Sequence, residues 1–175
     1  MGGSYQSKWR QRVSHSKWVN NWGLVKVIVK LCRAFHDYAP DLPEFDSADP
    51  FTGRVWWEIP LELYWTERDW FAGQWIAAGM RYIPGVLVNT FALPGTAGGM
   101  DMLDCAIYFF SQADLSALHS WRTDQVESVM AYFQLFDVFL DGEDDCMLVL
   151  ARIELLRREI RHLEANRASN RPSGN

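Results

Sequence analysis

The stretch GQWIAAGMRYIPGVLVNTFALPG, residues 73–95, decides whether the chain is a membrane protein or a water-exposed helical one. A membrane-spanning helix needs about 20 consecutive apolar residues. Because Gln74, Arg81 and Asn89 interrupt the stretch, we expect no membrane span. Pro84 lacks an amide proton, and its ring disfavours helical geometry at the preceding residue. The stretch therefore predicts two helices with a joint between them, and Pro84 is expected at the first position of the second helix.

Apolar residues at helical spacing extend this pattern to both sides. The helices that we expect cover residues 22–36, 66–82, 84–92, 101–110, 123–140 and 146–165. Thr66 and Thr123 are expected to cap two of the N-termini. The proline-rich segment before Thr66 is expected to form a loop, with at most one short strand or hairpin within residues 54–65. The fold class is therefore all-α, a compact single-domain helical bundle.

The length of 175 residues fits one domain, and 49% hydrophobic residues are enough for a globular core. The sequence predicts three parts. Residues 1–19 form a basic flexible arm, residues 20–165 form the helical domain, and residues 166–175 form a disordered tail.

Charge is distributed unevenly along the chain. The formal net charge is −5, which disfavours a general nucleic-acid binder. Residues 1–36, however, contain seven basic residues and no acidic ones, so only this arm is a candidate for binding RNA or an acidic chain. The alternative is that these charges only keep the arm and the first helix solvated.

The cysteines and histidines give no metal or disulfide pattern. Cys32, Cys105 and Cys146 are far apart and odd in number, which favours free thiols and a cytoplasmic location. The four histidines are widely separated, and the glycine-rich turn at 94–99 lacks the spacing of a nucleotide loop. We therefore expect no metal and no cofactor. An enzyme of unrecognised type remains an alternative, because catalytic groups can be distant in sequence.

Tryptophans and acids are the least ordinary feature of the chain. Five tryptophans fall within residues 56–75, interleaved with acidic residues. They can fill a core, stack on a sugar or anchor a protein partner. Since Trp56 and Trp57 are adjacent, at least one is expected to point outward. A second acidic cluster, DGEDD at 141–145, lacks the spacing of a calcium loop and suits an exposed negative surface.

Three short motifs resemble a family of small bacterial helical proteins of unknown function that have a Tyr-Leu/Ile-Pro helix junction. The matching residues are Ile28, Ala34 and Phe35, then RYIPGVL at 81–87, then TDQVESVMAYFQLF at 123–136. The resemblance covers much of residues 24–140 and transfers no catalytic residue. By analogy, it implies an immunity or antitoxin partner of the kind that is encoded beside a toxin.

The leading hypothesis is a toxin-neutralising, immunity-type protein that occludes a basic protein partner. The residues predicted to bind that partner are Trp56, Trp57, Glu58, Asp141, Glu143, Asp144 and Asp145. The first alternative is a structural or assembly subunit, which would form a homo-oligomer through residues 146–165 and use the basic N-terminal arm. The second alternative is the enzyme.

Overall fold

The computed structural model describes residues 22–38, 51, 54–67, 79–92, 97–112, 114–140 and 144–169. Every regular element within these ranges is a helix, which confirms the all-α helical bundle. In chain order the elements are α3 (Trp22–Ala34), η1 (Trp56–Glu58), α4 (Leu61–Thr66), α6 (Gly79–Ala92), α7 (Ala97–Gln112), η2 (Leu115–Ser120), α8 (Thr123–Leu140) and α9 (Asp144–Ser169).

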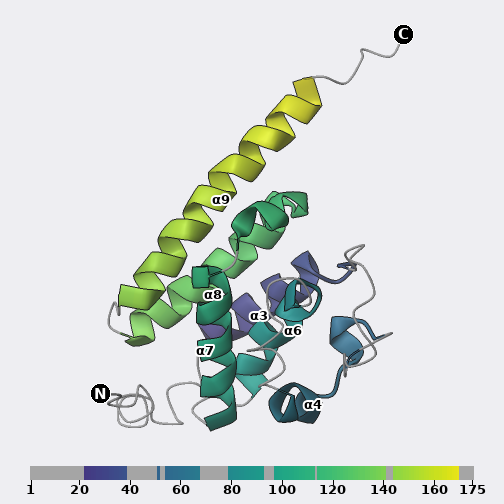
Figure 1. Ribbon diagram of the computed structural model, residues 1–175, viewed down its shortest axis with the longest axis vertical. Coiled ribbons are helices and arrows are strands. Elements are labelled where there is room, and N and C mark those ends of the chain that lie inside the picture. Colours follow the sequence, from purple (N-terminus) through teal and green to yellow (C-terminus); the bar gives the residue numbers. More distant parts are fainter. Residues whose placement is uncertain are drawn as a thin grey trace.

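The helices pack in two connected groups (Figure 1). The pair α8 and α9 lies side by side, joined at one end, and both α3 and α7 pack against this pair. The helix α6 packs against α3 and α7, and α4 and η1 pack in turn against α6. The helices α3 and α7 therefore connect the long hairpin to α6, and α6 carries the tryptophan-bearing segment.

The apolar seam of α9 packs inside the chain. Val149, Ile153, Leu156 and Ile160 are at most 2% exposed, and α9 contacts both α8 and α7. The heptad-like spacing therefore serves the core of this chain. The helix continues to Ser169, past the expected boundary at residue 165, and its C-terminal end projects beyond the other helices (Figure 1).

The side chains of Gln125 in α8 and Glu164 in α9 cap the N-terminus of α8, which corrects the predicted Thr123 cap. The Arg122 amide donates to the Gln125 side chain at 2.9 Å, and Thr123 is the first helical residue. Both the amide and the hydroxyl of Thr123 donate to the Glu164 carboxylate of α9. A carboxylate is stabilised at this position because the first amides of a helix have no internal partner.

The expected joint at Pro84 is wrong. One helix, α6, runs from Gly79 to Ala92 and contains Pro84 in its second turn. Because Pro84 has no amide hydrogen, the helix lacks one hydrogen bond, the bond to the Met80 carbonyl. Burial on both sides of Pro84 offsets that loss, because the neighbouring residues are fully buried. These residues are Tyr82, Ile83, Val86 and Leu87.

The strand considered within residues 54–65 is replaced by η1 and α4. An isolated strand leaves its amides without partners. The 3-10 turn instead bonds the Glu58 amide to the Val55 carbonyl at 2.9 Å, and Pro60 precedes the first residue of α4. The helix expected to begin at Thr66 is also wrong at its start, since Thr66 ends α4 and its hydroxyl donates to the Leu63 carbonyl.

The other boundaries follow the periodicity closely. The helices predicted at 22–36 and 123–140 appear as α3 and α8. The helix α7 begins at Ala97, earlier than the expected residue 101, so part of the glycine-rich turn is helical. Residues 1–19 and 170–175 lie outside the described residues, as do most of the residues between α4 and α6. No helix in the described ranges is long and apolar enough to cross a membrane.

We predict that Ile153→Ala lowers the free energy of unfolding by about 2–5 kcal/mol, because it opens a cavity at a fully buried seam position. Leu155→Ala is the matched control, since Leu155 lies on the same helix and is 58% exposed. Its effect should stay within about 0.5 kcal/mol. Urea denaturation measures both values, and equal losses would contradict the internal role of the seam.

Candidate functional site

Trp56 belongs to the core, which corrects its predicted role as a partner anchor. Its side chain is 6% exposed, and its indole N–H donates to the Phe35 carbonyl at 2.9 Å. This bond fixes η1 against the C-terminal end of α3. A buried indole is stable here because its single donor is satisfied.

Tyr64 of α4 holds the other side of the same turn. Its hydroxyl donates to the Trp56 carbonyl at 3.1 Å, and its ring stacks on Phe51 with centroids 5.6 Å apart. Burial raises the pKa of Tyr64 well above its usual value, so the hydroxyl remains a donor at neutral pH. A Cβ at Gly85 of α6 would lie 1.8 Å from the Tyr64 hydroxyl oxygen. Glycine is therefore needed at position 85 for α4 to approach α6.

With Trp56 held inward, Trp57 points outward, as predicted for one of the two adjacent tryptophans. Its side chain is 49% exposed, although tryptophan is among the largest apolar side chains. The two indoles meet edge to face, with centroids 5.6 Å apart and an interplanar angle of 87°. Because Trp57 rests on a ring that is itself fixed, it has a defined position at the surface.

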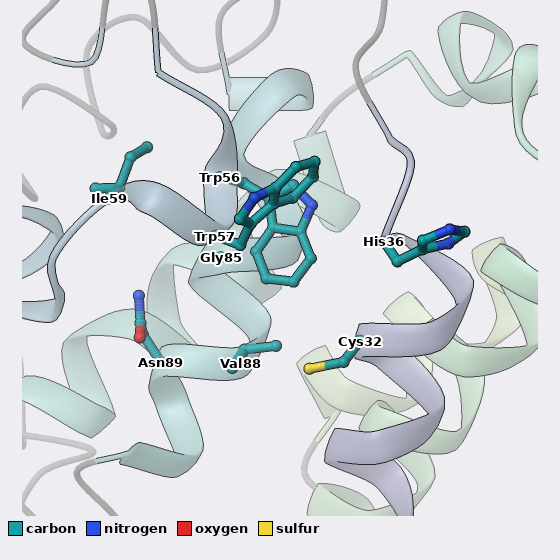
Figure 2. A pocket seen from close by; sticks show the side chains of 8 residues that line it. All are labelled: Cys32, His36, Trp56, Trp57, Ile59, Gly85, Val88 and Asn89. Carbon is teal, nitrogen blue, oxygen red and sulfur yellow. The ribbon is translucent and has the colours of Figure 1, made fainter.

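A pocket of about 470 Å³ lies next to the two indoles, and we call it the Trp57 pocket. The described residues that line it come from α3, the segment that follows α3, η1 and α6. They are Cys32, His36, Trp56, Trp57, Ile59, Gly85, Val88 and Asn89. Figure 2 shows Val88 and Cys32 directed toward each other below the indoles, while the His36 ring is directed away from them. The volume falls in the range of small-ligand sites, about 300–1,000 Å³.

The polar groups of the Trp57 pocket are few and mostly uncharged. Burial raises the pKa of the Cys32 thiol above its usual value, while a backbone hydrogen bond acts in the opposite direction. The thiol is therefore protonated at neutral pH and is not an activated nucleophile. Asn89 contributes a half-buried carboxamide from α6. The arrangement suits binding of a neutral group.

The predicted acidic residues divide between described and undescribed parts of the chain. Glu58 is exposed beside Trp57, as expected. Asp141 and Glu143 lie outside the described residues. Asp144 and Asp145 begin α9, but their side chains are also outside the described set. Only Trp57 and Glu58 of the predicted set are therefore placed together at this surface.

Sequence reasoning missed the α3 and α6 walls of the pocket. Val88 and Asn89 lie one helical turn beyond Gly85, so their spacing is a local signal for a shared face of α6. Cys32 lies more than 50 residues away in sequence. No local sequence pattern predicts that Cys32 lines the same cavity, because its position results from the packing of α3 on α6.

A second hollow of about 420 Å³ lies between η2 and α9 and contains polar residues. The His119 Nε2 atom lies 2.9 Å from the Glu159 carboxylate. Asp114 accepts the Ser116 amide at the start of η2, and Arg152 donates to the Ser111 carbonyl. These side chains form hydrogen bonds to one another and to the backbone, and the pair His119–Glu159 joins η2 to α9. The enzyme alternative stays a prediction.

No group of three or more histidine, cysteine, aspartate or glutamate residues in the described ranges is arranged to hold a metal ion. Comparisons with protein-family models, with curated proteins and with solved structures find no match to the chain. The family resemblance therefore stays a prediction.

We predict that Gly85→Ala lowers the free energy of unfolding by about 2 kcal/mol, because the new methyl group overlaps the fixed Tyr64 ring. In a Tyr64→Leu background the overlapping ring atoms are absent. There the same change should be neutral or stabilising by up to about 1 kcal/mol, since alanine is a better helix former than glycine. Denaturant unfolding of the four variants gives the coupling between the two sites. Additive effects would exclude the proposed contact.

Proposed function

We propose that the chain is a protein-binding domain of immunity type, which recognises a protein partner through the surface around Trp57. The observation that supports this proposal most directly is the 49% exposure of Trp57, a large aromatic side chain held over a concave and largely apolar pocket. Tryptophan is enriched among the few residues that supply most of the binding energy at interfaces. A rigid anchor also loses little conformational entropy on binding.

The hydrogen bonds that fix the turn containing Trp57 favour binding through a preformed surface. The Trp56 indole donates to the carbonyl of Phe35, the residue after α3, and the Tyr64 hydroxyl donates to the Trp56 carbonyl, so both flanks of the turn are fixed to the core. Complexes with such preorganised surfaces show small backbone changes on association. Recognition by this surface therefore needs no rearrangement of the helices.

Net charge supports a basic partner, and a toxin neutralised by occlusion is the form of this function that we propose. The chain has a net charge of −5, which steers basic proteins toward it. Next to Trp57, the exposed Glu58 adds a negative charge to the same surface. The acidic residues at 141–145 are the second feature that favours a basic partner.

We predict that Trp57→Ala raises the Kd for the polypeptide that co-purifies with the chain by about 10- to 100-fold, the loss expected for an interface anchor. Tyr108→Ala is the matched control, because Tyr108 is also a half-exposed aromatic residue, 52% exposed, on α7. Calorimetric titration with the purified partner measures both. An unchanged Kd for Trp57→Ala, or equal losses in both variants, would contradict the proposal.

Self-association through α9 is the second candidate, and exposed apolar side chains on that helix favour it. Met147, Leu148 and Leu155 are 52%, 51% and 58% exposed, although the buried seam of the same helix is fully used inside the chain. Leu148 and Leu155 are seven residues apart and lie close to the same face of the helix.

If α9 pairs with a second copy, the double variant Leu148→Glu/Leu155→Glu converts the dimer to a monomer, because it places charges in the contact. Sedimentation equilibrium measures the change. A monomeric parent chain would exclude this candidate and would leave the Trp57 surface unaffected.

A further inference from the structure

We propose that the Trp57 pocket receives an aromatic side chain from an exposed peptide segment of the partner, and that Asn89 hydrogen-bonds the backbone amide next to that side chain. The proposal rests on the function inferred above and names the chemistry that the same surface recognises. Three features of the pocket support it. The Asn89 carboxamide lines the pocket, the walls are aromatic and aliphatic, and none of the described lining residues directs a charged group inward.

Asn89 supplies the polar contact. Its side chain lines the pocket from α6 and is half-buried, and its carboxamide makes no hydrogen bond to the described residues. Asparagine is a poor helix former, so its place within a helix has no local advantage. A carboxamide offers one acceptor and two donor hydrogens, which match the N–H and C=O of a peptide group. The donors and the acceptor of the Asn89 carboxamide therefore match a backbone amide of a bound peptide.

The walls supply the apolar contact. Trp57 and Ile59 lie on one side, and Val88 projects from α6 toward Cys32 of α3 (Figure 2). The indoles already meet each other edge to face, and a further ring at the mouth of the pocket would repeat that geometry. Aromatic pairs of this kind contribute beyond the area that they bury. An aromatic side chain is therefore the group that gains most from these walls.

The charge of the pocket favours a neutral group. His36 and Cys32 are the only described lining residues with a side chain that can ionise. The His36 ring is directed away from the indoles, and its Nδ1 lies 3.6 Å from the Asp37 carboxylate. An ionised ligand group buried in this pocket would therefore have no opposite charge near it, and burying an unpaired charge costs free energy. A peptide amide with an uncharged ring avoids that cost.

The first experiment uses three small probes on the intact chain: N-acetyl-phenylalanine amide, N-acetyl-alanine amide without the ring, and toluene without the amide. Chemical-shift titration of the Val88 and Asn89 backbone amides measures the Kd. We expect N-acetyl-phenylalanine amide to bind at least tenfold more tightly than N-acetyl-alanine amide. Equal shifts from both amides, or no shift at Val88 and Asn89 with either one, would overturn the proposal.

Asn89→Ala separates the two contacts. The variant should weaken binding of N-acetyl-phenylalanine amide about three- to tenfold and leave toluene binding unchanged, because only the amide contact is removed. Alanine also favours the helix, so the variant should remain folded. Ser116→Ala, in the hollow beside α9, is the matched control and should change neither Kd. A parallel loss for both probes would exclude the amide contact.

Val88→Trp tests whether the partner uses the same pocket, since the larger side chain fills the space from the α6 side. We expect it to abolish binding of the probes and to raise the Kd for the partner at least tenfold; Val88→Met, a smaller filling, should have an intermediate effect. If partner binding survives both Val88 variants but is lost in Trp57→Ala, the proposed function stands and the pocket proposal fails. If partner binding also survives Trp57→Ala, the proposed function itself fails.

Discussion

The contact between Tyr64 and Gly85 determines the arrangement of the described surface. Because no side chain projects at Gly85, the Tyr64 ring lies directly against α6, and its hydroxyl reaches the Trp56 carbonyl at 3.1 Å. Trp56 is then close enough to α3 to donate to Phe35. The turn has no freedom to exchange its two indoles, so Trp57 faces solvent. The exposed anchor and its pocket are thus consequences of one close approach of a ring to a glycine.

Aromatic residues with satisfied polar tips join the irregular segments to the helices. Besides Trp56, the Tyr82 hydroxyl donates to the Phe51 carbonyl at 3.3 Å, and the Trp121 indole donates to the Tyr38 hydroxyl at 3.0 Å. Each link combines a large buried area with one hydrogen bond, which fixes a segment that has no regular backbone pairing of its own. For the described residues, this explains the high aromatic content better than a platform for stacking sugars.

Charged residues of α3 and of the α8 N-terminus serve structure as well as surface charge. Arg122 donates to the Ala34 carbonyl at 2.7 Å and lies 3.3 Å from the Asp37 carboxylate, so it joins the two helices. Lys30 donates to the Glu127 carbonyl of α8 at 3.1 Å. Part of the basic excess in residues 1–36 therefore has partners within the chain. A count of charges alone therefore overestimates how many basic side chains are free to contact a partner.

The sequence by itself determined the helical class, the extents of α3 and α8 and the seam of α9, because apolar periodicity depends on neighbours within a few residues. It did not determine that Pro84 lies inside α6, since that depends on how much apolar surface the rest of the helix buries. Nor did it determine which of Trp56 and Trp57 is buried. The pocket needs Cys32, Trp57 and Val88 together, and these residues come from three separate segments. Only the tertiary structure decided that arrangement, because it follows from side-chain packing between segments distant in sequence.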